Sequence, residues 1–236
     1  MYEKKRILAI IPARGGSKGL IGKNNKLLNG KPLISWSIDQ AKKSSFIDEI
    51  FVSTDCENLA MTSGNYGIDV PFLRPSILAS DTASSTDVVF HVLSYFENKG
   101  KEFDYIILLE PTSPLRKHDD IDSAIRIAIS NKSSDGVISL GEVHMEHPMI
   151  VKKVNEHGRI VSYINNVDKI NQRQQADKAY FPYGVVYLIK TEVFKKEKSF
   201  YTNNMIPFFI ERWQNYEVDD IVDFDIIELL LKEYLK

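Results

Sequence analysis

The residues best suited to chemistry lie in a loop near the start of the chain. Residues 13–24 follow an apolar run, Ile7–Pro12, and combine four glycines with Arg14, Lys18 and Lys23. Glycines let backbone N–H groups approach a ligand closely, and the basic side chains would surround that ligand with positive charge. The loop is therefore predicted to bind a phosphate chain.

This loop matches neither of two common phosphate-binding motifs. A Walker A loop needs Gly-x-x-x-x-Gly-Lys-Ser/Thr, but Asn24 follows Gly22-Lys23, and Ser17 stands five positions before Gly22. The dinucleotide fingerprint Gly-x-Gly-x-x-Gly is absent from the loop as well. A solvated glycine loop with scattered charge stays an alternative, although the position directly after a strand favours a phosphate site.

Apolar runs alternate with amphipathic stretches over residues 7–140, which predicts the elements that position the loop. Strands are expected at Ile7–Pro12, Glu49–Thr54, near Val70–Leu73, Asp104–Leu109 and Gly136–Leu140, and helices at Pro32–Lys43, Glu57–Tyr66, Ser85–Asn98 and Asp119–Ser130. The alternation predicts an α/β fold with a mostly parallel sheet and helices on both faces. Ligands of such sheets bind beyond the carboxyl ends of the strands, where the glycine-rich loop would lie.

Residues 142–182 break this alternation. A strand is expected again at Gly184–Ile189, and an amphipathic helix at Ile221–Leu235. The chain of 236 residues is most simply one globular domain, 1–236, with an insertion at about 142–182. The insertion could be a loose connection or an excursion that packs against another surface.

Composition narrows the classes of partner. A formal charge of −2 and an isoelectric point near 6.2 give no reason to expect nucleic acid or an anionic membrane as a partner. The single cysteine, Cys56, cannot form an internal disulfide, which is typical of a reducing compartment. The apolar run after Tyr2 is too short for a signal peptide, and no stretch is long enough to span a bilayer. A cytoplasmic, soluble protein is expected.

Further motifs follow the loop along the chain. They are P-A-R-G-G-S-K-G with Lys23-Asn24, V-S-T-D at 52–55, L-R-P at 73–75, L-A-S-D-T-A-S-S at 78–85, P-T-S-P-L-R at 111–116 and R-Q-Q at 173–175. In this order they resemble the CMP-sialic acid synthetase family, cytidylyltransferases that activate nine-carbon acidic sugars. The resemblance covers nearly the whole chain. It implies a Rossmann-like, GT-A-like nucleotidyltransferase fold and a homodimer, made by the insertion, which reaches into the partner's sugar site.

The resemblance also implies an activity. The chain would transfer CMP from CTP to the 2-hydroxyl of a nine-carbon acidic 2-keto sugar, such as N-acetylneuraminate, legionaminate or a related nonulosonate, with Mg²⁺ as cofactor. The hydroxyl would attack the α-phosphate directly and pyrophosphate would leave. Two alternatives stay open. One is a nucleotidyltransferase for another sugar, such as the eight-carbon Kdo, against which R-Q-Q argues. The other is a non-catalytic CTP-binding protein with a regulatory role.

The nucleotide side of the site follows from the matching motifs. By resemblance the triphosphate would be bound by Arg14, Ser17, Lys18, Lys23 and Asn24, and cytosine by Arg74, Ala83 and Ser85. Lys23 and Arg14 are the expected catalytic residues, with Lys23 stabilising the charge on the leaving pyrophosphate. Taken alone, Arg74-Pro75 favours a strand exit with a solvated arginine, and Thr54-Asp55 could be a helix cap.

The sugar side is implied by later motifs. Arg173 would pair with the sugar carboxylate through two hydrogen bonds, and Gln174 could add another. Further sugar-binding candidates are Glu110, Thr112, Ser113 and Tyr183. Many members of the family have glutamine in place of Glu110 and asparagine in place of Tyr183. Both departures fall on the sugar side and favour legionaminate over ordinary N-acetylneuraminate.

Metal ligands are expected near the start of the last helix. Mg²⁺ prefers oxygen ligands and keeps several waters, so one or two carboxylates suffice. Glu217 and Asp219 alternate across Val218 and would share one face of an extended segment. The family usually has aspartate where this chain has Glu217. In the alternative, Asp219, Asp220 and Asp223 only cap the final helix.

Overall fold

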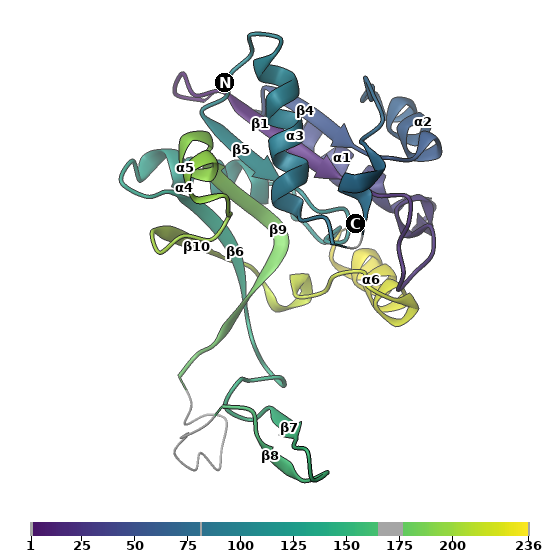
Figure 1. The fold of residues 1–236 in the computed structure, drawn as a ribbon, viewed down its shortest axis with the longest axis vertical. Helices are drawn as coiled ribbons and strands as arrows, with labels where there is room; N and C mark the ends of the chain where they lie inside the picture. Colours follow the sequence, from purple (N-terminus) through teal and green to yellow (C-terminus); the bar gives the residue numbers. More distant parts are fainter. Residues whose placement is uncertain (1, 81, 165–176, 236) are drawn as a thin grey trace.

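The computed structural model describes residues 2–80, 82–164 and 177–235, and a six-stranded sheet forms its centre (Figure 1). The strands are β1 (Ile7–Pro12), β4 (Glu49–Ser53), β5 (Tyr105–Leu108), β6 (Gly136–Glu142), β9 (Tyr180–Lys190) and β10 (Met205–Phe209). Their order is β10-β6-β9-β5-β1-β4. β9 runs antiparallel to both of its neighbours, and all other pairs in this sheet are parallel. The predicted mostly parallel sheet is confirmed.

Helices cover both faces of the sheet (Figure 1). The helices are α1 (Leu33–Lys43), α2 (Glu57–Asn65), α3 (Ser85–Glu97), α4 (Asp120–Ser130) and α5 (Thr191–Glu197). Odd-numbered residues of β1, such as Ile7 and Ile11, share a core with α1, α2 and α4. The even-numbered Leu8 and Ile10 share a second core with α3 and α5. Burial on both faces explains why β1 is apolar throughout.

The last helix, α6 (Ile221–Tyr234), packs below the carboxyl ends of the strands. Its Phe224, Ile227 and Leu231 share a third core with residues that include Leu28 and Leu33. Leu28 lies in the small antiparallel pair β2 (Leu27–Leu28) and β3 (Lys31–Pro32), just after the 3-10 helix η1 (Lys23–Asn25). This packing brings the segment before α6 next to the glycine-rich loop.

Residues 143–164 and 177–179 lie between β6 and β9 and belong to an arm below the body (Figure 1). Its described part carries the antiparallel hairpin β7 (Lys152–Val154) and β8 (Ile160–Ser162). Apolar side chains on this hairpin face solvent, with Val154 70% and Ile160 76% exposed. Arg173 and Gln174 lie outside the described residues.

Most of the expected elements form close to their predicted bounds, but the strand predicted near Val70–Leu73 is wrong. In the described residues β4 is the edge of the sheet, and 70–73 is irregular. Instead, Phe72 in this segment packs against the core beside α3. Its ring lies 5.7 Å from that of Phe51 and 4.9 Å from that of Tyr95. Among the described residues, no helix combines the length and the apolar character that a membrane span needs.

Candidate functional site

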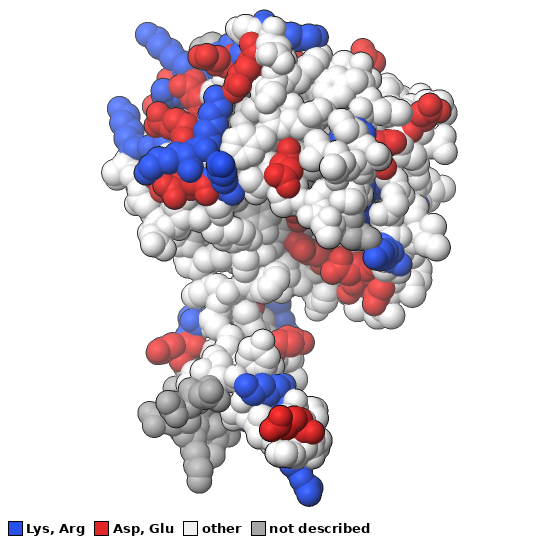
Figure 2. All heavy atoms as spheres, viewed as in Figure 1, with Lys and Arg blue, Asp and Glu red and all other residues white. Residues whose placement is uncertain are grey.

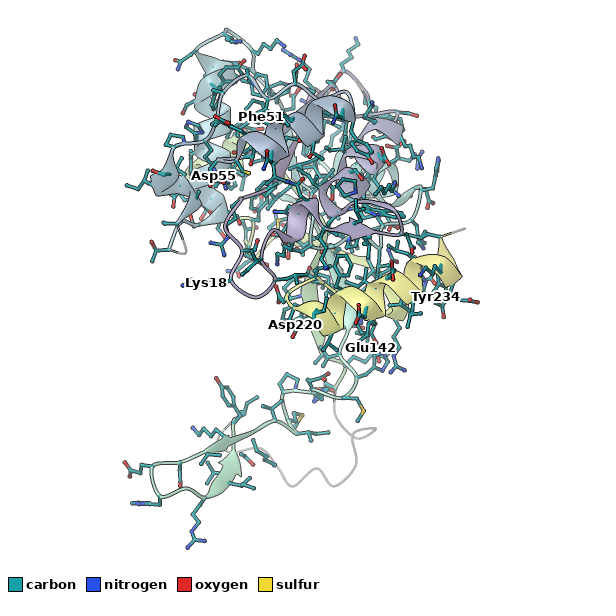
Figure 3. The ribbon with its side chains drawn as sticks, turned by 90° about the vertical axis from the view of Figure 1, so that its right-hand side faces the viewer. Lys18, Phe51, Asp55, Glu142, Asp220 and Tyr234 are labelled. Atoms are coloured by element: carbon teal, nitrogen blue, oxygen red, sulfur yellow. The ribbon has the colours of Figure 1, made fainter. Side chains whose placement is uncertain are left out.

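The glycine-rich loop is held against the two turns that flank it. On one side the Gly15 N–H donates to Asp55 Oδ1 at 3.0 Å, and a Cβ at Gly15 would lie only 2.8 Å from Cys56 Cβ. On the other side a Cβ at Gly19 would collide with the Asp219 carbonyl oxygen. Figure 3 shows the loop, with Lys18, between the turn that carries Asp55 and the start of α6. Both glycines are therefore required by close backbone approach.

The loop forms one wall of a cleft of about 470 Å³ at the carboxyl ends of the strands. The lining residues are Pro12, Arg14, Ser17, Lys18, Gly19, Lys23, Asn24, Arg74, Leu78, Ser80, Ala83, Ser84, Ser85, Val88, Glu110, Pro111, Thr112 and Asp219. Every residue that the sequence suggested for the nucleotide is in this set. The structure therefore brings together residues that are separated by more than sixty positions in the chain.

Several buried polar atoms in the cleft wall have no partner among the described residues. They are Ser17 Oγ, Asn24 Oδ1 and Arg74 Nε. Leaving a buried donor or acceptor unpaired costs about 1–3 kcal/mol, which a bound ligand can recover. Their presence in one cleft indicates a binding site for a polar molecule.

Lys23 connects the loop to the segment before α6. Its Nζ donates to the Val218 carbonyl oxygen at 2.6 Å and lies 3.5 Å from Asp219 Oδ1. The neighbouring Asn24 donates from Nδ2 to the Arg14 carbonyl oxygen at 3.1 Å, which fixes the loop internally. Lys23 is 15% exposed, so its charge sits in the cleft wall with limited screening by water.

Arg74 lies on the opposite wall and is only 5% exposed. Its backbone N–H donates to the Thr54 carbonyl oxygen at 2.6 Å. Burial lowers the pKa of the Arg74 guanidinium, and Asp55 acts in the opposite direction. The alternative of a solvated arginine at a strand exit is thus wrong. The helix-cap alternative for Asp55 is wrong too, because the N-cap of α2 is Cys56 and no side chain caps this end.

Glu110 lines the floor of the cleft, and Glu217, which is outside the cleft lining, converges with it on Gly184. A Cβ at Gly184 would lie 2.5 Å from Glu110 Oε2 and 3.0 Å from Glu217 Oε1. Glu217 Oε1 also accepts hydrogen bonds from Ser113 Oγ, at 2.7 Å, and from the Gly184 N–H. The pKa of Glu110 is raised to about 7, mainly by burial and in addition by the nearby Glu217 carboxylate. Glu110 can therefore carry a proton near neutral pH.

Arg116 supports this floor from inside the core. It is fully buried, and its guanidinium donates to the carbonyl oxygens of Val185 at 2.5 Å, Gly184 at 2.7 Å and Glu110 at 2.8 Å. A further hydrogen bond of 2.8 Å reaches Ser37 Oγ on α1. Burial lowers the pKa of Arg116 to about 10. Arg116 therefore positions the strand ends and is absent from the cleft lining.

A smaller pocket of about 150 Å³ adjoins the cleft and shares Glu110 and Ser85 with it. The other lining residues are Thr86, Leu108, Tyr187, Ser199, Phe200 and Tyr201. Sequence reasoning missed the aromatic residues of this pocket, because Phe200 and Tyr201 follow α5 in a segment without a motif. Tyr183 lies elsewhere, in a separate hollow of about 430 Å³ at the base of the arm.

The carboxylates around the start of α6 divide into capping and cleft residues. Asp220 accepts from the N–H groups of Val222 and Asp223, and Asp223 accepts from those of Asp219 and Asp220. The helix-cap alternative is therefore right for Asp220 and Asp223. It does not account for Asp219, which lines the cleft with a side chain that is 87% exposed.

Asp219 fits a magnesium ion that keeps most of its waters. In the described residues no group of three or more His, Cys, Asp or Glu side chains converges to hold a metal. Mg²⁺ needs only one or two carboxylates when substrate phosphates supply the rest. Acidic side chains gather over α6 in Figure 2, so the local charge suits a cation. Glu217 is less available, because its Oε1 already accepts two hydrogen bonds.

Comparison with protein families gives one match over most of the chain. A model of the cytidylyltransferase family matches residues 8–232. The CMP-N,N'-diacetyllegionaminic acid synthase of Legionella pneumophila is 34% identical over 229 residues, which are 96% of this chain and 97% of that protein. The pseudaminic acid cytidylyltransferase of Campylobacter jejuni is 30% identical, over 95% of this chain and 96% of that protein.

Other similar proteins are longer or more distant. The N-acylneuraminate cytidylyltransferase of Streptococcus agalactiae is 36% identical over 92% of this chain, which spans only 51% of that protein. Among solved structures, a CMP:2-keto-3-deoxy-manno-octonic acid synthetase complexed with CTP superposes with a TM-score of 0.72 at 17% identity, over 97% of this chain and 99% of that one. A 4-diphosphocytidyl-2C-methyl-D-erythritol synthase gives a TM-score of 0.67 at 14% identity, over 96% and 100%. These structures share the fold of this chain.

Proposed function

Since the chain belongs to the cytidylyltransferase family, we propose that it transfers CMP from CTP to the 2-hydroxyl of a nine-carbon acidic 2-keto sugar and releases pyrophosphate. The observation that carries this proposal is the cleft, in which the glycine-rich loop, Arg74 and the 83–85 segment form one lining. The names of the relatives refer to legionaminic, pseudaminic and neuraminic acids, which are all sugars of this class.

The triphosphate of CTP would lie along the glycine-rich loop. Ser17 Oγ and the loop N–H groups can donate to its oxygens, and the charges of Arg14 and Lys18 attract it. The oxygen of the sugar hydroxyl then bonds to the α-phosphorus, its proton is released to solvent, and the bond from this phosphorus to the pyrophosphate oxygen breaks. Lys23 stabilises the negative charge that develops on the leaving group, because its Nζ sits in the cleft wall.

We assign the Mg²⁺ site to Asp219, with Glu217 as a second candidate. A bound Mg²⁺ would offset phosphate charge and orient the triphosphate. Asp219 can turn toward the metal because its side chain is exposed and its pair with Lys23 is long, 3.5 Å. To bind the metal as well, Glu217 would need either Oε1, which already accepts hydrogen bonds from Ser113 and Gly184, or its other carboxylate oxygen.

The sugar would lie over Glu110 and Thr112, with an acyl-amino substituent in the small aromatic pocket. That pocket is about 150 Å³, and Phe200 and Tyr201 give it apolar walls next to Glu110. We propose that Arg173 and Gln174, which lie outside the described residues, bind the sugar carboxylate. Among the three acids we favour legionaminic acid, because that relative is 34% identical over nearly its full length, against 30% for the pseudaminic acid enzyme. Glu110 also departs from the glutamine of sialic acid synthetases.

We also propose that the 236 residues form one catalytic unit that works as a cytoplasmic homodimer through the arm. The exposed apolar side chains of the β7–β8 hairpin are suited to burial against a second copy of the chain. Replacing Val154 and Ile160 by aspartate should produce monomers in sedimentation velocity runs, whereas the same change at the exposed Leu229 on α6 should not. Unchanged sedimentation of the arm variant would contradict the proposal.

Pyrophosphate release tests the activity. With Mg²⁺ and CTP, we expect release in the presence of N,N'-diacetyllegionaminate, N-acetylneuraminate or pseudaminate, and little with ATP, GTP or UTP. Kdo serves as the eight-carbon comparison. Pyrophosphate release with Kdo alone would mean that the substrate is an eight-carbon sugar instead. CTP binding without pyrophosphate release for any of the acids would favour a regulatory role.

A further inference from the structure

Asp55 joins the two halves of the nucleotide cleft, although it is not part of the cleft lining. It follows β4 in the turn before α2, and its Oδ1 accepts the Gly15 N–H of the glycine-rich loop at 3.0 Å. The same oxygen lies 3.7 Å from Arg74 Nη2 on the opposite wall. One carboxylate oxygen therefore contacts both the loop and the buried arginine.

Arg74 depends on this carboxylate for its charge balance. The arginine side chain is 3% exposed, and Asp55 is the acidic partner in its ion pair. The neighbouring cation, Arg14, acts in the unfavourable direction. A buried guanidinium needs a counter-charge and hydrogen bonds to remain in place, yet Arg74 Nε has no partner in the described residues. The guanidinium is thus held at one end and has donors left for a ligand.

Hydrogen bonds hold the backbone of the turn that carries Asp55. The Cys56 N–H donates to Thr54 Oγ1 at 3.1 Å, and the Arg74 N–H donates to the Thr54 carbonyl oxygen at 2.6 Å. Gly15 lies so close to Cys56 that a Cβ there would be only 2.8 Å from Cys56 Cβ. The turn that carries the carboxylate is therefore hydrogen-bonded to the Arg74 backbone and packed closely against the loop.

We propose that Asp55 is a positioning residue, which orients the Arg74 guanidinium toward the nucleotide base and holds the phosphate-binding loop through Gly15. This inference rests on the proposed function in CTP binding. It adds that base selection and triphosphate binding share one carboxylate, so that the two halves of the cleft are coupled.

The chemistry of arginine explains why orientation matters for base selection. A guanidinium only donates hydrogen bonds, and its donors have a fixed planar geometry. Cytosine presents O2 and N3 as adjacent acceptors, whereas uracil presents an N3–H donor beside O2. An oriented Arg74 can therefore donate to both acceptors of cytosine, whereas with uracil one of its donors would face the N3–H donor. An arginine free to rotate would lose this discrimination.

The test compares CTP and UTP binding by calorimetry in the full chain with Mg²⁺ and without sugar. Asp55→Asn keeps an oxygen for the Gly15 N–H but removes the charge beside Arg74. It should weaken CTP binding about tenfold and change UTP binding less than about twofold. Asp55→Ala also removes the acceptor for Gly15, so it should weaken both nucleotides. Asp69→Asn, an equal charge change at an exposed position, is the control and should alter neither.

The outcomes separate this inference from the proposed function. A CTP preference in the wild type that falls about tenfold in Asp55→Asn, with an unchanged melting temperature, supports the role of Asp55. An unchanged preference in Asp55→Asn, or an equal loss for both nucleotides, overturns it and leaves the proposed function standing. A wild type without preference for CTP overturns both.

Discussion

Replacing Glu110 by glutamine should change how the stability of the protein depends on pH. The folded protein raises the pKa of this carboxyl from 4.5 to about 7, because the group is buried beside Glu217. Between these values the folded state binds more protons than the unfolded state, so its stability falls as pH rises. The stability that this shift contributes is complete below pH 4.5, and it is lost as the pH rises through about 7. The shift corresponds to about 3 kcal/mol.

The assay is urea unfolding at pH 5 and pH 8 in the presence of EDTA. Glu110→Gln has nearly the same shape as the wild type and no charge to bury, so its free energy of unfolding should lack this component of the pH dependence. Relative to the variant, the wild type should lose up to about 3 kcal/mol between the two pH values. Glu102→Gln, at an exposed position, is the control. Equal pH dependence of the wild type and the Glu110 variant would refute the argument.

Three further substitutions test other parts of the site. Lys23→Ala should lower kcat roughly 100-fold and change the KM for CTP much less, and a loss confined to KM would contradict its role toward the leaving group. Gly19→Ala should raise the KM for CTP, because its Cβ would collide with backbone, whereas Gly16→Ala, with open space around it, should behave as wild type in the same assay. Arg116→Lys should destabilise the fold by about 3 kcal/mol or more in urea unfolding, since lysine cannot reach all the acceptors, and the exposed Arg159→Lys should not.

The sequence predicted the elements that have strong hydrophobic periodicity. Those elements are buried on a regular face, so their patterns are visible without the structure. β10 was missed because Pro207 argues against a strand, yet this strand lies at the sheet edge, where proline is tolerated. α5 was missed because it begins directly after β9 and has only seven residues.

The candidate site was predicted as a set of motifs, and its internal geometry was not. Local order along the chain placed the glycine-rich loop correctly at a strand end, but it placed Arg74 after a strand at 70–73 that does not form. It could not show that Asp55 joins them, because a side chain before a helix usually caps that helix. The convergence of Glu110 and Glu217 depends on the close packing of Gly184 from another strand, which has no signature in sequence.

A crystal structure with CTP and Mg²⁺ would show directly whether the cleft binds the nucleotide. We expect triphosphate oxygens within hydrogen-bond distance of Ser17 and the loop N–H groups, cytosine against Arg74, and a metal on Asp219. CTP bound in another hollow, or in the cleft with the base on the loop and the phosphates at Arg74, would contradict this expectation.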